Sequence, residues 1–232
     1  MNTTPWKDDD DLFAIVKSRL YSAVVGDIMD KMGYVRQFLS PRIQPLHKDM
    51  FVAGRAMTVL EADTFEEISK DSNHPAMARP FGFMLDALDD LRKNEVYICT
   101  GGSPAYALWG ELMSTRAMKL GAAGVVLNGY SRDMRGILAL NFPTFSYGSY
   151  AQDQSLRGKV IDFRVPIEIH GVRILPGDII VGDMDGVCVV PQSIEEEVFR
   201  RAIEKANGEK TVQEAIAAGM SAREAFDRFG IL

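Results

Sequence analysis

Two adjacent opposite charges, Arg132 and Asp133, follow the apolar run GVVLNG (residues 124–129), where a strand is expected to end. The planar guanidinium of Arg132 could hold a carboxylate or a keto acid through two parallel hydrogen bonds. An ionised Asp133 only accepts hydrogen bonds and could bind a hard cation such as Mg²⁺, which takes one or two protein carboxylates and keeps several waters. The pair therefore predicts a site for an acidic substrate and a metal ion.

The start of a helix near Gly110 is predicted to supply the rest of this site. The run TGGSPAYALWG (residues 100–110) is typical of a glycine-bounded loop before a helix, and the first amides of a helix have no intrahelical partners. Such amides bind anions, and a carboxylate suits them well. Glu111 could also hold one of the waters of the metal ion. The amides concerned belong to Gly110, Glu111, Leu112 and Met113.

A purely structural interpretation of these residues stays open. An Arg-Asp pair at the start of a helix is frequently an N-capping aspartate beside a surface arginine, and the glycine pair at 101–102 is typical of a turn. Spacing alone favours this interpretation, because a dipeptide is weak evidence for a site. His74 lies in the polar, unperiodic segment 63–80 without a partner at ligand spacing, so it is predicted to be a solvated loop residue. His170, at an HG turn, is predicted to be structural.

The elements that must position the site alternate between helix and strand. Carboxylates ahead of apolar residues at helical spacing predict a helix from about Asp9, and Ser22 is predicted to cap a second helix that stops at Gly33. The run FVAGRAMTVLEA (51–62) is predicted to be a strand with a glycine kink or bulge. Strand EVYICT, a helix over 110–120 and strand GVVLNG then predict a parallel βαβ unit, with ligands beyond the carboxyl ends of its strands.

The C-terminal half of the sequence differs in its pattern of apolar runs and turn residues. From Phe142, short apolar runs broken by Pro and Gly, with turn signals at HG, PG and DG, predict hairpins or a small, partly antiparallel layer packed on the same domain. The run SIEEEVFRRAIEKANG (193–208) has the pattern of a capped amphipathic helix, and two shorter helices are expected after it. Because no linker or repeat divides the chain, we expect an α/β fold with one domain over 1–232, a polar leader at 1–10 and helical termini.

Composition excludes several classes of protein. Of the 232 residues, 47% are hydrophobic and 25% charged, which is typical of a globular chain. The net charge of −6 and the absence of a basic run argue against a nucleic-acid groove. Cys99 and Cys188 lie in apolar runs and are predicted to be free, buried thiols. Since neither a signal peptide nor a membrane-spanning run is evident, a cytoplasmic location without membrane contact is expected.

The run WGELMSTRAMKLGAAGVVLNGYSRD (109–133) resembles the signature region of the RraA-like family. That family includes the class II pyruvate aldolases acting on 4-hydroxy-4-methyl-2-oxoglutarate and 4-carboxy-4-hydroxy-2-oxoadipate. Those aldolases carry an acidic residue, twenty intervening residues and then Arg-Asp, which Glu111 and Arg132-Asp133 match. The resemblance covers most of the chain, including SAVVGDIMDKMG and GVRILPGDIIVGDMDGVCVVP. Many of the aldolases have aspartate in place of Glu111, which puts the substrate preference in doubt.

The resemblance implies both a fold and a chemistry. The fold would be a swivelling β/β/α domain in a homotrimer or dimer of trimers, with active sites between subunits and the C-terminal helices (193–232) packed on a neighbouring subunit. The amides from Gly110 to Met113 and Arg132 would bind the pyruvyl group, and Asp133 would ligate Mg²⁺ or Mn²⁺. The metal and Arg132 would stabilise the enolate formed when a 4-hydroxy-2-oxo acid is cleaved by a retro-aldol reaction that releases pyruvate.

Several alternatives stay open at this stage. The general base could be a metal-bound water held by Glu111, or Glu204 or Glu209 of a neighbouring subunit. Oxaloacetate decarboxylation through the same enolate is expected as a side activity. A member of the family could instead be a regulator that binds a ribonuclease without catalysis. A methyltransferase is the weakest alternative, because the chain lacks a G-x-G-x-x-G cradle after a strand.

Overall fold

An eight-stranded mixed sheet forms the centre of the structure, a computed structural model that describes residues 4–64 and 72–230. Its strands follow the order β1-β7-β5-β3-β2-β11-β12, and β8 pairs with the second half of β2. The strands from β7 to β2 are parallel, whereas β1, β8, β11 and β12 run antiparallel to their neighbours. The strands are β1 (Gln44–Pro45), β2 (Val52–Asp63), β3 (Glu95–Cys99), β5 (Gly124–Leu127), β7 (Thr144–Ser146), β8 (Gly158–Phe163), β11 (Ile179–Asp183) and β12 (Gly186–Val190).

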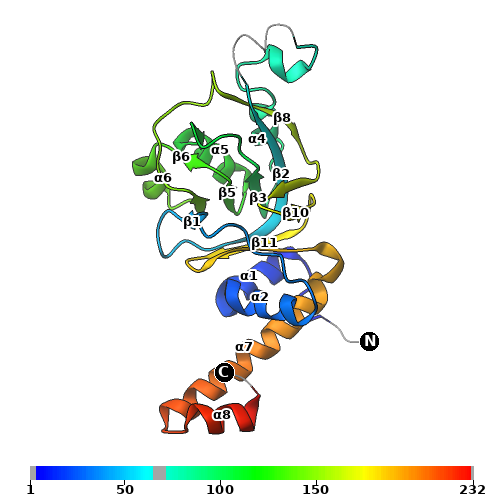
Figure 1. Cartoon of the computed structure of the whole chain (residues 1–232), viewed down its shortest axis with the longest axis vertical. Coiled ribbons are helices and arrows are strands. Elements are labelled where there is room, and N and C mark those ends of the chain that lie inside the picture. The colour runs from blue at the N-terminus through cyan, green and yellow to red at the C-terminus, as the bar shows by residue number, and fades with distance from the viewer. Residues whose placement is uncertain (1–3, 65–71, 231–232) are drawn as a thin grey trace.

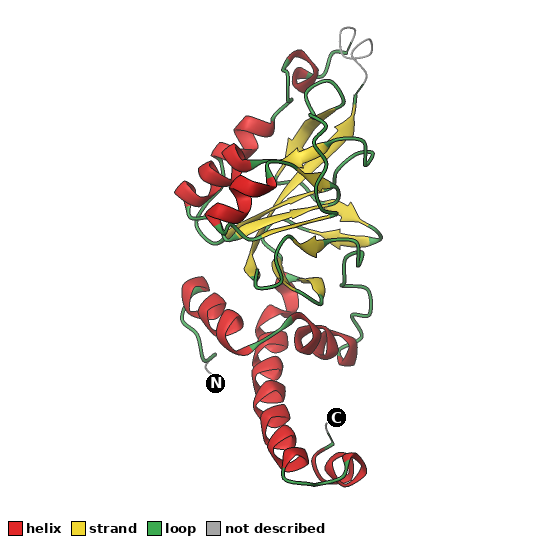
Figure 2. Ribbon diagram, turned by 90° about the vertical axis from the view of Figure 1, so that its left-hand side faces the viewer, coloured by secondary structure: helices red, strands yellow, loops and turns green. Residues whose placement is uncertain are grey.

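Both faces of the parallel strands are buried, which explains their unbroken apolar sequences. Successive residues of a strand point to opposite faces. Tyr97 and Val125 pack against helices on one face, whereas Val96 and Val126 pack against a separate hairpin on the other. Figure 2 shows these helices gathered on one side of the sheet. The covering elements are α4 (Met84–Asp89), α5 (Glu111–Leu120), α6 (Met134–Leu140) and the hairpin of β9 (Ile167–Ile169) and β10 (Val172–Ile174).

A second group of helices packs against the β11–β12 hairpin, below the sheet in Figure 1. Val25 and Phe199 from these helices are fully buried against Val181 and Val190 of the hairpin. The later part of α7 extends away from the sheet and carries α8 with it, as Figures 1 and 2 both show. The helices are α1 (Asp9–Arg19), α2 (Ser22–Lys31), α7 (Glu195–Ala217) and α8 (Ala222–Phe229).

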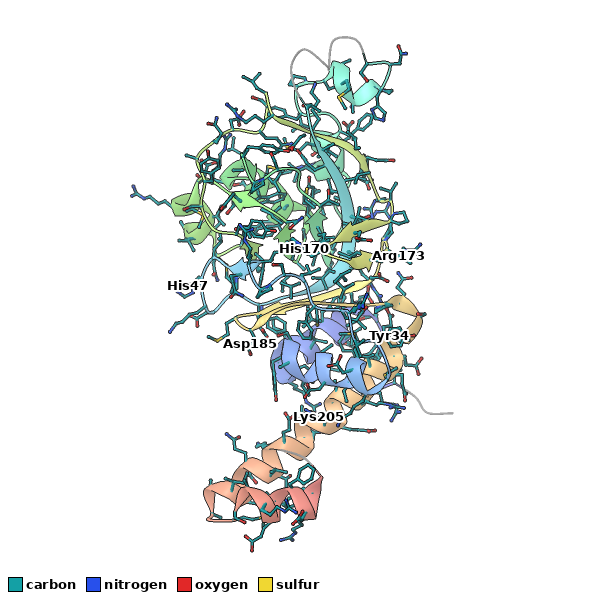
Figure 3. The ribbon with its side chains drawn as sticks, viewed as in Figure 1. Tyr34, His47, His170, Arg173, Asp185 and Lys205 are labelled. Atoms are coloured by element: carbon teal, nitrogen blue, oxygen red, sulfur yellow. The ribbon has the colours of Figure 1, made fainter. Side chains whose placement is uncertain are left out.

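Charged contacts hold these helices in place. The Arg55 guanidinium on β2 donates to both carboxylate oxygens of Asp9 on α1, at 2.9 and 2.6 Å, and to Glu195 Oε1 at the start of α7, at 3.0 Å. Farther along α7, Lys205, labelled in Figure 3, donates to Asp27 Oδ2 of α2 at 2.7 Å. The C-terminal helix α7 is therefore held beside α1 and α2, which come from the other end of the sequence.

Most predicted elements are confirmed. The first helix begins at Asp9, and the second ends just before Gly33, whose φ of +88° suits glycine. The strands β3 and β5 that flank α5 are parallel. The two C-terminal hairpins turn at His170-Gly171 and at Asp185-Gly186, as the dipeptides predict. Pro176-Gly177 also lies in a turn, but the strands β10 and β11 on either side of it belong to different sheets.

Two predictions about the first third of the chain are wrong. Ser22 does not cap α2; it is the first residue of the helix, and its amide and hydroxyl donate to the Asp183 carboxylate at 2.6 and 2.7 Å. The irregularity in β2 lies between Leu60 and Glu61 rather than at Gly54. A Cβ at Gly54 would approach the Asn94 carbonyl oxygen to 2.4 Å, so this glycine permits close strand packing and makes no bulge.

Two predictions about the C-terminal third are also wrong. The β11–β12 hairpin was expected in a small layer packed on the domain. It is part of the central sheet instead, because residues 179–182 of β11 pair with β2. The helix expected to end at residue 208 continues through Gly208 as one helix of 23 residues, and it begins without a side-chain cap. The capping box is found at Ser221, at the start of α8. Only one further helix follows α7 in the described chain.

The thiol and membrane predictions have different outcomes. Cys99 and Cys188 are free and buried, as predicted. Among the described residues, no helix combines the length and the apolar character needed to span a bilayer. A cytoplasmic location stays a prediction. The predicted loop or weak helix over 63–80 lies partly outside the described residues; its described part holds a short 3-10 helix, Pro75–Ala78.

Candidate functional site

A pair of short parallel strands brings the two halves of the predicted site together. The strand β4 (Ala107–Trp109) pairs with β6 (Tyr130–Ser131), and the Arg132 amide donates to the Trp109 carbonyl at 2.9 Å. The helix α5 follows β4 directly, and α6 follows β6. Gly110 and the Arg132-Asp133 pair therefore leave neighbouring strands at the same end. The run 100–110 was predicted to be a loop. Its last residues form the strand β4 instead.

Asp133 points at the start of the neighbouring helix α5. Its backbone adopts the left-handed conformation, with φ +58° and ψ +37°, which is uncommon outside glycine and asparagine or aspartate. Its Oδ2 accepts a hydrogen bond from the Glu111 amide at 3.4 Å. A Cβ at Gly110 would lie 2.5 Å from the same oxygen, so glycine at this position permits the approach. The Asp133 carboxylate is therefore bound to the other helix and does not cap its own helix α6.

Arg132 lies between two carboxylates. Its Nη1 donates to Asp153 Oδ1 at 2.6 Å, and its Nε lies 3.9 Å from Asp133 Oδ2. The side chain is 39% exposed, so part of the guanidinium stays open to a ligand. Ser155, which donates to the Asp153 carboxylate, and the nearby Arg132 hold the pKa of Asp153 below its usual range. Asp153 is consequently an anion that orients Arg132.

Glu111 reaches the site over a glycine of α6. A Cβ at Gly136 would lie 2.1 Å from the carboxyl carbon of Glu111, so the Glu111 side chain occupies the space that Gly136 leaves. Behind the site, the buried Trp109 donates through Nε1 to Ser114 Oγ at 2.7 Å and joins β4 to α5. The structure thus brings Glu111, Arg132 and Asp133 together at the start of two helices, as the spacing predicts.

A cavity of about 240 Å³ opens beside these residues. Gly110, Arg132, Asp133 and Asp153 line one side of it. The other side is apolar and comes from α4, β4 and α5. It includes Met84, Leu88, Leu108, Trp109, Leu112 and Met113. A small acid can therefore lie with its charged end toward Arg132 and its other end against apolar side chains.

The donor set at the site fits a hard divalent cation that keeps most of its waters. No three His, Cys, Asp or Glu side chains of the described residues gather as a ready-made metal site. The Asp133 carboxylate is 48% exposed, and the Glu111 carboxylate lies over Gly136, on the helix that Asp133 precedes. Mg²⁺ and Mn²⁺ accept one or two carboxylates with water and substrate oxygens, whereas a closed zinc site needs three or four ligands of the N/S/O type.

The other candidate residues lie elsewhere. His74 is exposed and accepts the Ala76 amide through Nδ1 at 3.3 Å, which confirms a loop residue. His170, labelled in Figure 3, lies in the turn of the β9–β10 hairpin, and its Nε2 is 2.9 Å from the Tyr147 hydroxyl. Glu204 and Glu209 both bond basic residues of their own helix α7, Arg200 and Lys205. A role for either glutamate in a neighbouring subunit stays a prediction.

Sequence reasoning missed two residues near the site. Asp153 and Gln154 lie in the polar segment AQDQSLRG, which has no periodicity and no motif. No local sequence pattern distinguishes either residue, because Gln154 contacts Glu61 of β2 and Asp153 contacts Arg132, which follows β6. Only the folded chain shows that this segment passes beside Arg132.

Comparisons with known proteins identify the family of the chain. A model of the RraA-like family (Aldolase/RraA) matches residues 22–189. A protein of Halalkalibacterium halodurans with the name "Putative 4-hydroxy-4-methyl-2-oxoglutarate aldolase" is 32% identical over 189 residues, which cover 81% of this chain and 82% of that protein. Protein DlpA of Legionella pneumophila is 29% identical over 205 residues, 88% of this chain, but this chain spans only 31% of its length.

A solved structure shows the same fold. The crystal structure of Streptomyces coelicolor RraAS2, described as an unusual member of the RNase ES inhibitor RraA protein family, superposes with a TM-score of 0.75 at 24% identity. The superposition covers 90% of this chain and 99% of that one. The family match over residues 22–189 includes the whole site described above. The chain therefore belongs to the RraA-like family.

Proposed function

We propose that this protein is a divalent-metal-dependent lyase, a class II pyruvate aldolase that cleaves a 4-hydroxy-2-oxo acid and releases pyruvate. The observation that carries the proposal is the meeting of Glu111, Arg132 and Asp133 at the start of two helices beside a small cavity. The relative from Halalkalibacterium halodurans, which this chain matches over most of both lengths, supports this choice through its aldolase name.

The chain's own groups would bind and orient the substrate. The first-turn amides of α5 and the open part of the Arg132 guanidinium would hold the pyruvyl carboxylate and keto oxygen. Asp133 would hold Mg²⁺ or Mn²⁺, with Glu111 on one of its waters. Such an ion supplies Lewis-acid stabilisation of negative charge on the keto oxygen. Arg132 would stabilise the same charge as the carbon–carbon bond breaks, because its cationic side chain lines the cavity.

The same arrangement suits oxaloacetate decarboxylation, which also leaves a pyruvate enolate, so we propose it as a side activity. The base that takes the hydroxyl proton is assigned to a water held by Glu111 or to Glu204 or Glu209 of a neighbouring subunit. The second candidate function is a ribonuclease-binding regulator, favoured by the fold shared with the RNase inhibitor family. Such a regulator does not require the exposed Asp133 carboxylate next to Arg132.

We also propose that the protein acts as a homotrimer or a dimer of trimers, with the C-terminal helices (193–232) packed on a neighbouring subunit. Large apolar side chains at the cavity mouth and on α8 support this assembly: Leu112 is 84% exposed, Leu85 56% and Phe226 52%. Light scattering of the purified protein should give a trimer or hexamer mass, and Leu112→Asp should reduce it. A monomeric wild-type protein contradicts the proposed assembly.

Asp133→Ala tests the proposed activity. The wild-type protein with Mg²⁺ or Mn²⁺ is expected to release pyruvate from a panel of 4-hydroxy-2-oxo acids, and Asp133→Ala should lose the metal-dependent rate while its circular dichroism spectrum is unchanged. The matched control is Asp185→Ala, an exposed aspartate on the β11–β12 turn, labelled in Figure 3, which should keep the wild-type rate. Equal metal-dependent rates in wild type and Asp133→Ala would refute the assignment. Tight ribonuclease binding without pyruvate release would favour the regulator.

A further inference from the structure

A buried carboxyl group lies behind the loop that holds Arg132. Glu61, on β2, is only 5% exposed, and its Oε1 accepts a hydrogen bond from Gln154 Nε2 at 2.7 Å. Gln154 is itself 4% exposed, so this contact is sealed from water. The next residue along the chain, Asp153, turns the other way and binds Arg132 at 2.6 Å. Two consecutive residues thus connect Glu61 with the candidate site.

Several hydrogen bonds hold the segment 152–158. The Gln152 carbonyl accepts the Ala107 amide of β4 at 2.8 Å, and the Arg157 carbonyl accepts the Thr64 amide at 2.8 Å. Gly158 begins β8 and pairs with β2. Among the described side chains, Glu61 is the buried partner of the Gln154 amide. The contact with Glu61 therefore fixes the side chain of Gln154, the residue next to Asp153.

The surroundings of Glu61 favour its neutral form. Burial removes the carboxyl from water, and Asp63 lies two residues along the same strand, on the same face. The Tyr106 hydroxyl donates to Asp63 Oδ1 at 2.9 Å and lies beside Glu61 above Gly158. Burial first and Asp63 second raise the pKa of Glu61 to about 8, and the Tyr106 hydroxyl opposes them in part. The titratable groups that face Glu61 from its own and neighbouring elements are Asp63, Tyr97, Cys99 and Tyr106.

We infer that Glu61 is a positioning residue of the candidate site: its buried carboxyl accepts the Gln154 amide, and thereby keeps Asp153 against Arg132 in the geometry that receives the substrate carboxylate. Loss of the Glu61 proton places a buried negative charge beside the exposed Asp63. The Gln154 amide donates to either form of the carboxyl, so the separation of the segment 152–158 from β2 comes from the water that must enter to solvate this charge. Arg132 loses its fixed partner as a result. The expected effect on turnover rests on the proposed function. The expected movement of the segment 152–158 is independent of that function.

The test compares the wild-type protein with Glu61→Gln, which keeps the shape of the side chain but has no proton to lose. Wild-type kcat/KM for pyruvate release should fall about tenfold per pH unit above pH 8, with the larger change in KM, whereas Glu61→Gln should keep its activity over the same range. Glu168→Gln, a change at an exposed glutamate of β9, is the matched control and should retain the wild-type pH profile.

A second measurement is independent of turnover. Amide hydrogen exchange of segment 152–158, corrected for the intrinsic effect of pH, should accelerate in the wild-type protein above pH 8 and stay slow in Glu61→Gln. Asp153→Asn should raise KM and reduce the alkaline fall in activity, because Arg132 has already lost its charged partner in this variant. A wild-type protein without aldolase activity would refute the proposed function, while the exchange data would still decide the inference. Identical exchange and identical pH dependence in wild type and Glu61→Gln would overturn the role of Glu61.

Discussion

Replacing Glu61 by glutamine should stabilise the folded protein, and the gain should increase with pH. The pKa of Glu61 is raised from 4.5 to about 8 in the folded protein, with burial as the main cause. The folded state therefore holds this proton more tightly than the unfolded state does. The stability that the neutral carboxyl contributes is fully present below pH 4.5 and is lost as the pH rises toward about 8. Glutamine does not ionise, so the variant escapes this loss.

The size of the effect follows from the interval between the two pKa values of Glu61, 4.5 and about 8. One unit of pH within the interval changes the free energy of unfolding by about 1.4 kcal/mol for a single carboxyl. Between about pH 5 and about pH 7, two units apart, the stability of Glu61→Gln relative to wild type should rise by about 3 kcal/mol. Solvent screening reduces this little, because Glu61 is only 5% exposed. The difference between the two proteins should become constant above about pH 8.

Urea unfolding at a series of pH values measures this difference directly. Fluorescence of the buried Trp109 can report the transition, and the linear extrapolation gives the free energy of unfolding in water. Glu168→Gln, at an exposed position, should differ from wild type by a constant amount at every pH. A stability difference between Glu61→Gln and wild type that does not change from pH 5 to pH 8 would show that the carboxyl is ionised in the folded protein, and the reasoning would fail.

Three further perturbations test other parts of the structure. Arg132→Lys should lower kcat/KM for pyruvate release by about 10-fold to 100-fold, since an ammonium cannot form two parallel bonds; an unchanged rate would contradict this. Gly136→Ala would place a Cβ 2.1 Å from the Glu111 carboxyl, so the carboxyl must move, and calorimetry should show Mn²⁺ affinity reduced about tenfold. Arg55→Met should lower the free energy of unfolding by about 2 to 3 kcal/mol in urea, because two partly buried carboxylates lose their partner.

Much of the fold could be predicted from local patterns in the sequence. Hydrophobic runs with glycine ends located β3 and β5, and the dipeptides His170-Gly171 and Asp185-Gly186 located two hairpins. These predictions succeed because alternation, turn dipeptides and capping depend on neighbours in sequence. The helix α7 shows the limit of local rules. Asn207-Gly208 favours a helix end, but the packing of α7 on α2 and its i,i+4 ion pairs sustain the helix through it.

The candidate site divides in the same way. The spacing from Glu111 to Arg132-Asp133 could be recognised in the chain, because a strand and a helix of usual length lie between them. The β4–β6 pair was not predictable, because strands of two or three residues carry no period and form only where a partner strand is already held. Asp153 and Glu61 likewise depend on contacts between residues far apart in sequence. Local patterns therefore located the residues at the start of α5 and α6, whereas the residues that contact them from other elements, such as Asp153, come together only when the chain has packed.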